Sequence, residues 1–428
     1  MGSRSGGRSR VGIDGTAVDA LDAERLDWRF KAIPVSAHGM TVAEARRARL
    51  PLADFGTPLL TLDAGALGHN VRVMAEWAAE AGLDLAPHGK TTMAPALWRA
   101  QLDAGAWGIT LANLPQLRVA RAFGVRRVVL ANALLDPAGL AWLAAEQDLH
   151  PGFEFFCWVD SVRAVELMDE ALRMARAQRP VHVCVELGGP NGRAGVRDDG
   201  DARRVADAVR GALTLRLAGI AGYEGVLARD ASEDGRRTVH AYLRRLANLH
   251  GGLDYEVDEP VVSAGGSAFF DQVAEVLGGL DGRVVLRSGA YIVHDDGFYR
   301  GISPFARGSD GGGPRLRSAM HAWTRVVSRP EPALAILDAG RRDLPFDSGM
   351  PEPQFVRGRG TEPLEGARVT ALNDQHAYLV DGSAEVGDVV RLGLSHPCTA
   401  LDKWTLIPVV DDADAGNPAV VDYVRTWF

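Results

Sequence analysis

Several features are scarce or missing in this sequence, and each absence excludes a class of protein. Only three of the 428 residues are cysteine (Cys157, Cys184 and Cys398), too few for a disulfide framework and consistent with a reducing cytoplasm. Cys157 and Cys184 lie in apolar runs and are expected in the core. No apolar run approaches the length required to span a bilayer, so we expect no membrane partner. The formal net charge of −8 lacks the basic excess of a nucleic-acid-binding surface.

The first residues also lack a hydrophobic segment. Residues 1–10 are polar and rich in Gly, Ser and Arg, so we expect no secretory signal there. We assign residues 1–30 to a disordered tail and residues 31–56 to an N-terminal arm. The overall composition, 46% hydrophobic and 24% charged, is that of a globular protein, and the length suggests two domains.

Residues 57–300 alternate short β-type runs with amphipathic helical stretches. Eight β-type runs lie at residues 83–88, 108–112, 127–132, 154–159, 181–187, 215–223, 261–264 and 284–287. Helical patterns lie between them, for example at residues 94–104, 114–123, 162–177 and 202–212. This α/β alternation predicts a parallel (β/α)8 TIM barrel. A doubly wound open sheet is the alternative, because alternation alone does not force the sheet to close.

The pattern changes after residue 300. A Gly-Gly-Gly-Pro loop at residues 311–314 is followed by strand-like runs without long helices. These runs lie at residues 320–327, 333–338, 367–372, 377–379 and 388–394. They predict a C-terminal β domain over residues 301–428. A further run at residues 58–63, followed by a helix at residues 64–81, either begins the barrel domain or joins the β domain.

The first of the eight runs ends in the segment PHGKTT, which contains His88 and Lys90. A lysine at the mouth of a strand can have its ammonium partly desolvated, which lowers its pKa and makes it a nucleophile toward an aldehyde. Pyridoxal phosphate (PLP) is the biological aldehyde most often held by lysine as an imine. A solvated lysine after an ordinary strand is the alternative explanation.

Other strand ends also carry candidate residues, and in a βα barrel the chemistry gathers at these ends. They are Arg193 after the fifth run, Tyr223 after the sixth, Gly265, Gly266 and Ser267 after the seventh, and Tyr291 after the eighth. The Gly-Gly-Ser turn before a helix predicts a phosphate site, to which Tyr291 could add a hydroxyl donor. Arg193 could pair with an anionic oxygen of a cofactor. Each residue also has an ordinary structural explanation. The Gly-Gly-Ser segment could be a common turn, Tyr291 a packed aromatic ring, and Arg193 part of a surface ion pair.

Together these residues resemble the fold-type III PLP enzymes, which join an alanine racemase-like barrel to a β domain. The resemblance covers about residues 57–410, and PHGKTT is similar to the lysine motif of the D-serine dehydratase and D-threonine aldolase branch. It implies that Lys90 binds PLP covalently, with His88 beside it as a second catalytic candidate. It also implies that Arg193 contacts the phenolic oxygen of the cofactor and that residues 265–267 and 287–291 bind the phosphate. The family commonly has a histidine two residues after the tyrosine, where this chain has Gly225, so the role of Tyr223 stays open.

A second motif is SHPCTALDKW, in which His396 and Cys398 lie two positions apart. In an extended strand both side chains would point the same way, and imidazole and thiolate are ligands suited to zinc. Two ligands are too few for a structural zinc site, so the pattern predicts a catalytic metal completed by water or substrate. A chance pair is the alternative. The D-serine dehydratases resembled here carry a His-x-Cys zinc pair in this region, and related aldolases place a carboxylate where this chain has Cys398.

The resemblance thus implies a PLP- and zinc-dependent D-serine dehydratase-type lyase. Such an enzyme removes the β-hydroxyl group of a D-amino acid and gives a 2-oxo acid and ammonia. The resembled enzymes are homodimers, so we expect a homodimer. Retro-aldol cleavage of a D-β-hydroxy amino acid is the first alternative. An amino-acid decarboxylase, an amino-acid racemase and a non-catalytic cofactor carrier are further alternatives.

Overall fold

The computed structural model describes residues 12–190, 192–307 and 314–428. The chain divides into two compact units, which we describe separately. The barrel unit contains residues 77–88 and 98–288 together with the described residues up to Gly15. The β unit contains residues 16–76, 89–97 and 289–428, apart from the undescribed residues among them. None of the described helices is both long and apolar enough to cross a membrane.

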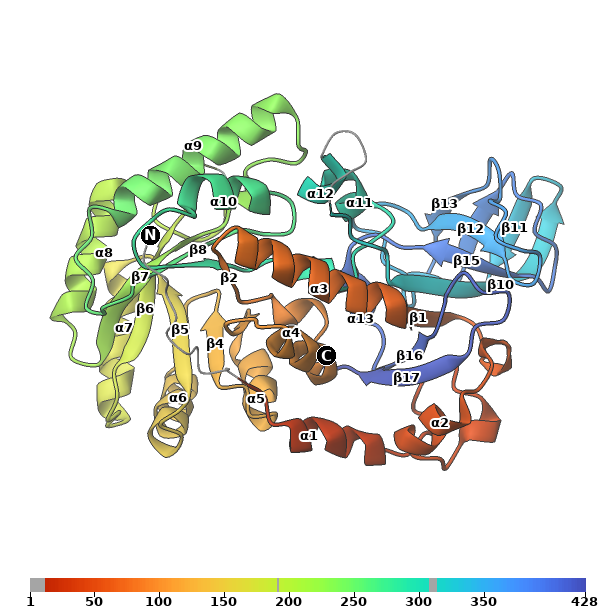
Figure 1. Cartoon of the computed structure of the whole chain (residues 1–428), viewed down its shortest axis with the longest axis horizontal. Coiled ribbons are helices and arrows are strands. Elements are labelled where there is room, and N and C mark those ends of the chain that lie inside the picture. Colours follow the sequence, from red (N-terminus) through yellow and green to blue (C-terminus); the bar gives the residue numbers. More distant parts are fainter. Residues whose placement is uncertain (1–11, 191, 308–313) are drawn as a thin grey trace. The chain divides into compact units, whose positions relative to one another are not determined.

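Eight parallel strands form the sheet of the barrel unit (Figure 1). They are β2 (Asp84–Leu85), β3 (Ile109–Leu111), β4 (Arg127–Leu130), β5 (Glu154–Val159), β6 (Val181–Leu187), β7 (Leu215–Gly222), β8 (Val261–Ala264) and β9 (Arg283–Leu286). Their order is β2-β9-β8-β7-β6-β5-β4-β3. A parallel bridge between His88 and Thr110 joins the two ends of this order, and Thr110 N donates to Pro87 O at 2.9 Å. The predicted barrel is therefore confirmed, and the open sheet is excluded.

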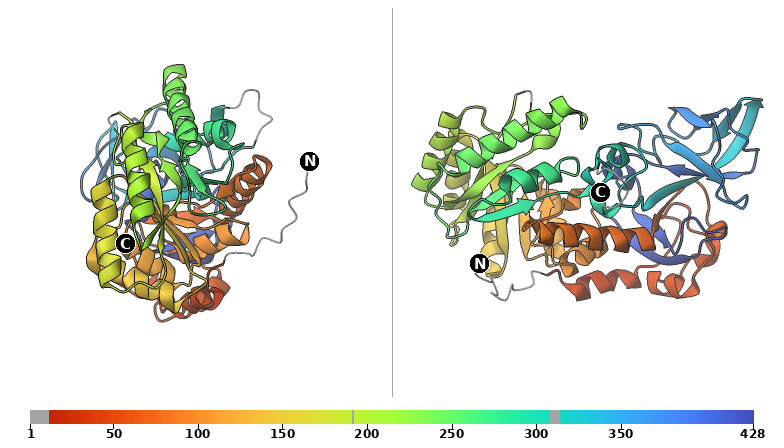
Figure 2. Two further views of the ribbon diagram at one scale, coloured as in Figure 1. Left: turned by 90° about the vertical axis from the view of Figure 1, so that its left-hand side faces the viewer. Right: turned by 45° about the horizontal axis from the view of Figure 1, so that its top comes forward.

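Helices cover the outside of these strands, as the end-on view of Figure 2 shows. They are α5 (Leu114–Ala122), α6 (Pro137–Leu149), α7 (Val162–Met174), α8 (Asp199–Gly211), α9 (Glu233–His250) and α10 (Phe270–Leu277), with α4 (Pro95–Asp103) before them. Short polar residues start five of these helices by accepting a backbone N–H bond. These caps are Asn113, Asp136, Ser161, Asp198 and Ser232.

The strands are buried on both faces, which explains why they read as continuous apolar runs in the sequence. One core cluster includes Trp107, Phe156, Trp158 and Cys184, and the rings of Trp107 and Phe156 lie 5.5 Å apart. Cys157 and Cys184 are both buried free thiols, as predicted.

A nine-stranded sheet forms the β unit. Its strands are β1 (Leu59–Asp63), β10 (Met320–Glu331), β11 (Leu334–Leu337), β12 (Glu352–Val356), β13 (Arg368–Leu372), β14 (Ala377–Val380), β15 (Val389–Gly393), β16 (Leu406–Val410) and β17 (Val420–Arg425). The order is β13-β14-β11-β10-β1-β16-β17, and β15 pairs with both β10 and β12. Because β1 pairs with β10 and β16, the run at residues 58–63 belongs to this sheet. The helix α3 (Ala64–Glu80) follows it.

The structure differs from the predicted tail over residues 12–30, which are folded. The helix α1 (Gly15–Asp19) and the turn η1 (Ala20–Ala23) lead to Leu26 and Phe30, which are buried in one core cluster with Trp323. The arm at residues 31–56 contains η2 (Val35–Ala37), α2 (Val42–Ala48) and η3 (Leu52–Asp54), and it adds apolar side chains to the same cluster. These buried apolar residues explain why the segment folds. Residues 1–11 lie outside the described part of the chain.

Candidate functional site

The loop after β6 carries Arg193 and is shaped by its own hydrogen bonds. Gly195 has a φ of +96°, and a Cβ there would lie 2.4 Å from the backbone nitrogen of Gly188. Its amide donates to Oδ2 of Asp160 at 3.0 Å. Arg197 braces the loop by donating to the carbonyl of Ala194 at 2.9 Å. The predicted glycine-rich loop is thus a defined turn that only glycine can make at position 195.

Arg193 and Tyr223, two predicted site residues, come together in the barrel unit. The guanidinium carbon of Arg193 lies 5.0 Å from the centre of the Tyr223 ring, within the range of a cation–π contact. The ring also leaves no room for a side chain at position 266, because a Cβ on Gly266 would lie 2.9 Å from a Tyr223 ring carbon. The backbone N–H of Tyr223 donates to the Tyr242 hydroxyl at 3.1 Å, and that hydroxyl donates to the carbonyl of Leu187 at 2.6 Å. Tyr242 thus joins the ends of β6 and β7.

The turn after β8 differs from its sequence prediction, because a carboxylate occupies the glycine amides. Gly265 N donates to Oε2 of Glu224 at 2.9 Å, and Gly266 N donates to Oε1 at 2.8 Å. Glu224 begins the turn η5 (Glu224–Val226) and is 0% exposed. The predicted pair of phosphate donors is therefore already bonded within the protein. Ser267 follows in the same turn, ahead of α10.

Buried charged side chains lie near the Gly265–Gly266 turn. Arg287 is buried and donates to Ser263 Oγ at 2.5 Å and to the carbonyl of Gly222 at 2.7 Å. Burial lowers the pKa of Arg287, while the nearby Glu224 and Glu186 carboxylates oppose that shift. Burial likewise raises the pKa of Glu186 to about 7, against the charge of Arg287. The strand ends of this unit thus hold a compact set of opposite charges.

Lys90 lies in the β unit, in the turn η4 (Gly89–Thr91). The whole chain contains only three lysines, Lys31, Lys90 and Lys403. Lys31 Nζ donates to Asp343 Oδ1 at 3.0 Å, and Lys403 Nζ donates to the carbonyl of Thr399 at 2.6 Å. His88, the second catalytic candidate, belongs to the barrel unit through its bridge to Thr110.

His396 and Cys398 do come together, although not on an extended strand as predicted. β15 ends at Gly393, and His396 is the N-cap of a short helix, α13 (Pro397–Leu401), with a left-handed φ of +56°. Pro397 at the first helical position starts this helix. The two side chains lie near enough for Cys398 to shift the pKa of His396. The strand prediction was wrong, but the helix still places the two side chains near each other.

This pair also connects to the turn of Lys90 within the β unit. Cys398 Sγ and Thr91 Oγ1 are hydrogen bonded at 3.4 Å. Burial raises the pKa of Cys398, but hydrogen bonds with His396 and Thr91 and the charge of Lys90 outweigh burial and lower it. The interaction with Cys398, helped by Asp347, raises the pKa of His396 to about 9. The pair thus favours a thiolate, which is the form of cysteine that binds metals.

Two acidic residues that the sequence analysis missed fix His396. Its Nδ1 donates to Asp347 Oδ2 at 2.5 Å, and Thr399 Oγ1 donates to Asp347 Oδ1 at 2.7 Å. Its backbone N–H donates to Asp295 Oδ2 at 2.9 Å. Asp295 is fully buried and also accepts the amide of Tyr299 at 2.8 Å. A carboxylate on one imidazole nitrogen is the arrangement that commonly orients a metal-binding histidine.

The side chains of His396 and Cys398 are chemically suited to bind a metal ion. Imidazole and thiolate are both ligands of zinc. Among the residues that the structure describes, no group of three or more His, Cys, Asp or Glu side chains is arranged to hold a metal. The chain therefore offers two ligands here, and water or substrate would have to complete the coordination. Tyr291, the remaining predicted site residue, is buried in the turn η6 (Ala290–Ile292) of the β unit.

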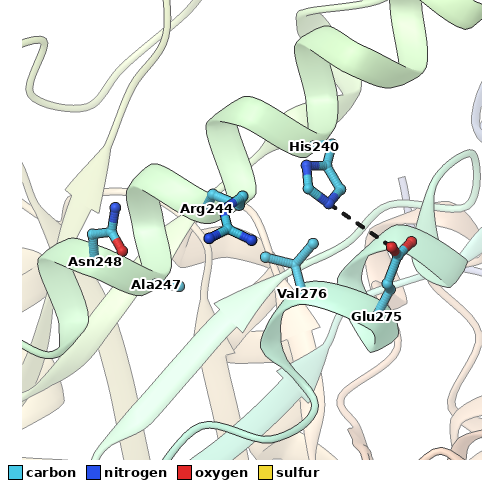
Figure 3. A pocket seen from close by; sticks show the side chains of 6 residues that line it. All are labelled: His240, Arg244, Ala247, Asn248, Glu275 and Val276. Atoms are coloured by element: carbon cyan, nitrogen blue, oxygen red, sulfur yellow. Dashed lines mark ion pairs between the residues drawn. The ribbon is translucent and has the colours of Figure 1, made fainter.

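A surface pocket lies elsewhere, between α9 and α10 (Figure 3). His240, Arg244, Ala247, Asn248, Glu275 and Val276 line it, and His240 Nε2 lies 3.8 Å from Glu275 Oε1. No predicted site residue lines this pocket.

Comparison with known protein families gives two matches. The alanine racemase N-terminal domain family matches residues 62–277, which is half of the chain. A serine dehydratase domain family matches residues 319–410. Among individual proteins, a D-threonine aldolase from an Arthrobacter species is 29% identical over 355 residues, covering 81% of this chain and 86% of that protein.

Solved structures agree with this picture of the fold. A D-threonine aldolase from Filomicrobium marinum superposes with a TM-score of 0.73 at 28% identity, covering 88% of this chain and 96% of the other. A D-threo-3-hydroxyaspartate dehydratase, solved as a cysteine-to-alanine variant in the metal-free form, gives a TM-score of 0.71 at 21% identity. That match covers 88% of this chain and 99% of the other. At this identity the second likeness shows the fold alone.

Proposed function

The chain belongs to the alanine racemase N-terminal domain family of fold-type III PLP enzymes, and from this premise we propose that it is a D-serine dehydratase-type ammonia-lyase. At the coarser level it is a PLP-dependent lyase of D-β-hydroxy amino acids. The proposal concerns the reaction, which removes the β-hydroxyl group as water and gives a 2-oxo acid and ammonia. We further propose a homodimer and a bound Zn²⁺ ion.

The scarcity of lysine carries the assignment of the cofactor lysine. A PLP enzyme of this family needs one amine, and the chain has only three lysines. Lys31 and Lys403 lie outside the PHGKTT motif. Lys90 is the one in the PHGKTT motif, next to the hydrogen bond between Cys398 and Thr91. We therefore assign the covalent attachment of the cofactor to Lys90.

The other proposed roles follow from the chemistry of each group. When bound, PLP withdraws electrons from the α-carbon of the substrate and so acidifies the α-proton. Lys90 Nζ would accept that proton. Arg193 pairs with the phenolic oxygen, while Ser267 and Tyr291 contribute hydroxyl donors to the phosphate. His88 is proposed to help with proton transfer.

His396 and Cys398 are proposed to hold the metal. A zinc ion there would polarise the β-hydroxyl group as a leaving group. Asp347 keeps the proton on His396 Nδ1, so that Nε2 is the nitrogen available as a ligand. Support comes from the nearness of the two side chains, each of which shifts the pKa of the other.

Retro-aldol cleavage is the second candidate, because two of the similar proteins are D-threonine aldolases. Such an enzyme would split D-threonine into glycine and an aldehyde. Cys398 favours elimination, because the aldolases that the motif resembles have a carboxylate at this position.

Product analysis tests the proposal directly. The purified protein, supplied with PLP and Zn²⁺, is incubated separately with D-serine, L-serine, D-threonine and D-threo-3-hydroxyaspartate. We expect 2-oxo acid and ammonia in equal amounts from at least one D-substrate and none from L-serine. Glycine as the main product from D-threonine would replace the dehydratase with the aldolase. Sedimentation of the same sample tests the dimer, and a monomer under all conditions would contradict it.

A further inference from the structure

The turn Gly265–Gly266 has all of its backbone polar groups bonded by the protein. Its two N–H groups donate to the Glu224 carboxylate at 2.9 and 2.8 Å. Its carbonyls accept from Arg287 N at 3.2 Å and from Ser288 Oγ at 2.8 Å. The turn is therefore held on both sides by side chains and backbone from the neighbouring strand ends.

Glycine is required at both positions of this turn. Gly265 has a φ of +95°, a conformation that L-residues rarely adopt, and a Cβ there would lie 2.0 Å from Leu286 Cδ1. At Gly266 a Cβ would lie 2.9 Å from the Tyr223 ring. The glycines thus serve close packing, and the sequence pattern that suggested phosphate contact has a second explanation in this structure.

Glu224 is the group that makes this geometry possible. A carboxylate can accept both amides at once, and hydrogen bonds to a charged acceptor are stronger than those between neutral groups. The residue is 0% exposed, so the two amides and the charge of the neighbouring Arg287 must replace its lost hydration. Glu224 also follows Tyr223 directly, so it joins the end of β7 to the turn after β8.

We propose that Glu224 is a positioning residue for the cofactor phosphate. It fixes the Gly265–Gly266 turn by taking both amides, so that the phosphate is bound by groups after Gly266, beginning with Ser267. A phosphate on the same two amides would have to displace a buried carboxylate or lie against it, and both are unfavourable for an anion. This inference rests on the proposed PLP function and assigns a residue that acts through the turn without touching the cofactor.

The test separates the phosphate from the rest of the cofactor. The dissociation constants of PLP and of pyridoxal, which lacks the phosphate, are measured with apoprotein of the wild type and of Glu224→Gln. The substituted amide keeps the size of the side chain but accepts well from only one of the two N–H groups. We expect Glu224→Gln to weaken PLP binding about tenfold or more and to leave pyridoxal binding unchanged.

Two further variants serve as a control and as an independent test. Glu275→Gln removes the same charge from an exposed position of α10 and should leave both constants unchanged. Ser267→Ala leaves the Glu224 carboxylate in place, and we expect it to lose affinity for PLP but not for pyridoxal, even if Glu224→Gln fails to fold. Circular dichroism monitors the folding of each variant.

The outcomes distinguish this inference from the proposed function. If the wild type binds PLP no better than pyridoxal, or binds neither, the PLP function itself fails. If the wild type prefers PLP and folded Glu224→Gln keeps the same preference, only the role of Glu224 is overturned. An unchanged preference in Ser267→Ala would overturn the assignment of the phosphate to the residues after Gly266.

Discussion

The imidazole Nδ1 of His396 donates to Oδ2 of Asp347 across 2.5 Å, between residues 49 positions apart in the chain. Asp347 also accepts from Thr399 Oγ1, so its carboxylate is fixed on both oxygens. A second acid, Asp295, fixes the backbone of the same histidine. Two carboxylates thus hold this histidine, Asp347 through the imidazole and Asp295 through the backbone N–H. A carboxylate on one imidazole nitrogen is the arrangement expected of a metal-binding histidine.

Replacing Asp347 with Ala should weaken metal binding, because the imidazole loses the bond that sets its tautomer and orientation. We expect the zinc dissociation constant to rise by about 10- to 100-fold while the cofactor content stays the same. Equilibrium dialysis with elemental analysis measures the first quantity, and absorbance measures the second. The exposed Asp402, at the other end of α13, provides the control variant Asp402→Ala. Equal zinc affinity in wild type and Asp347→Ala would contradict this role.

Replacing Cys398 with Asp should change the metal preference. Thiolate favours zinc, whereas a carboxylate favours Mg²⁺ and Mn²⁺. We expect the variant to bind zinc more weakly and to show its highest activity with Mn²⁺ or Mg²⁺, where the wild type shows it with Zn²⁺. Activity after chelation and addition of each metal measures this preference. An unaltered order of metals would show that Cys398 is no ligand.

The stability of the barrel unit should depend on pH through Glu186. Burial raises the pKa of Glu186 from 4.5 to about 7 in the folded chain. The folded state therefore holds this proton where the unfolded state releases it. The contribution of Glu186 to the free energy of unfolding is therefore fully present below pH 4.5 and is lost as the pH rises toward 7.

Thermal melts across this pH range compare the wild type with Glu186→Gln, which stays neutral. We expect the melting temperature of the wild type, relative to that of the variant, to fall between about pH 4.5 and 7 and then to level off. The exposed Glu80→Gln should follow the wild type. A constant difference between wild type and Glu186→Gln over the whole range would contradict the raised pKa.

Removing the Tyr242 hydroxyl should destabilise the fold. This hydroxyl donates to Leu187 O at 2.6 Å and accepts Tyr223 N at 3.1 Å, both near the ends of buried strands. In Tyr242→Phe both groups lose their partner, and we expect the free energy of unfolding to fall by about 2 kcal/mol. Denaturant titration measures it. Tyr378→Phe, which removes only an exposed bond to Asn373, should change it by less than about 0.5 kcal/mol.

The barrel was predictable because its strands are buried on both faces and therefore read as uninterrupted apolar runs. The strands β12, β16 and β17 were missed. Pro353 in β12 and Pro408 in β16 argue against strand structure in a sequence, since proline cannot donate to a ladder. The structure nevertheless pairs Pro408 with Tyr423 of β17. Tertiary pairing thus overrides the local signal in these strands.

The site was only partly predictable. Lys90, His396 and Cys398 lie in short motifs whose residue types suggest their chemistry. Glu224, Asp295 and Asp347 were missed, because an isolated acid in a loop is usually solvated and its backbone partners are far away in the sequence. Gly265 and Gly266 show the reverse case, in which a recognisable pattern was correct about the turn but the amides bond to Glu224.

Borohydride reduction of the PLP-loaded protein, followed by peptide mass spectrometry, tests the central assignment most directly. Reduction makes the bond between PLP and its lysine permanent, and the chain has only Lys31, Lys90 and Lys403 as candidates. We predict a pyridoxyl-phosphate label on Lys90 alone, and no label on folded Lys90→Ala. A label on Lys31 or Lys403, or none on the loaded wild type, would contradict the account.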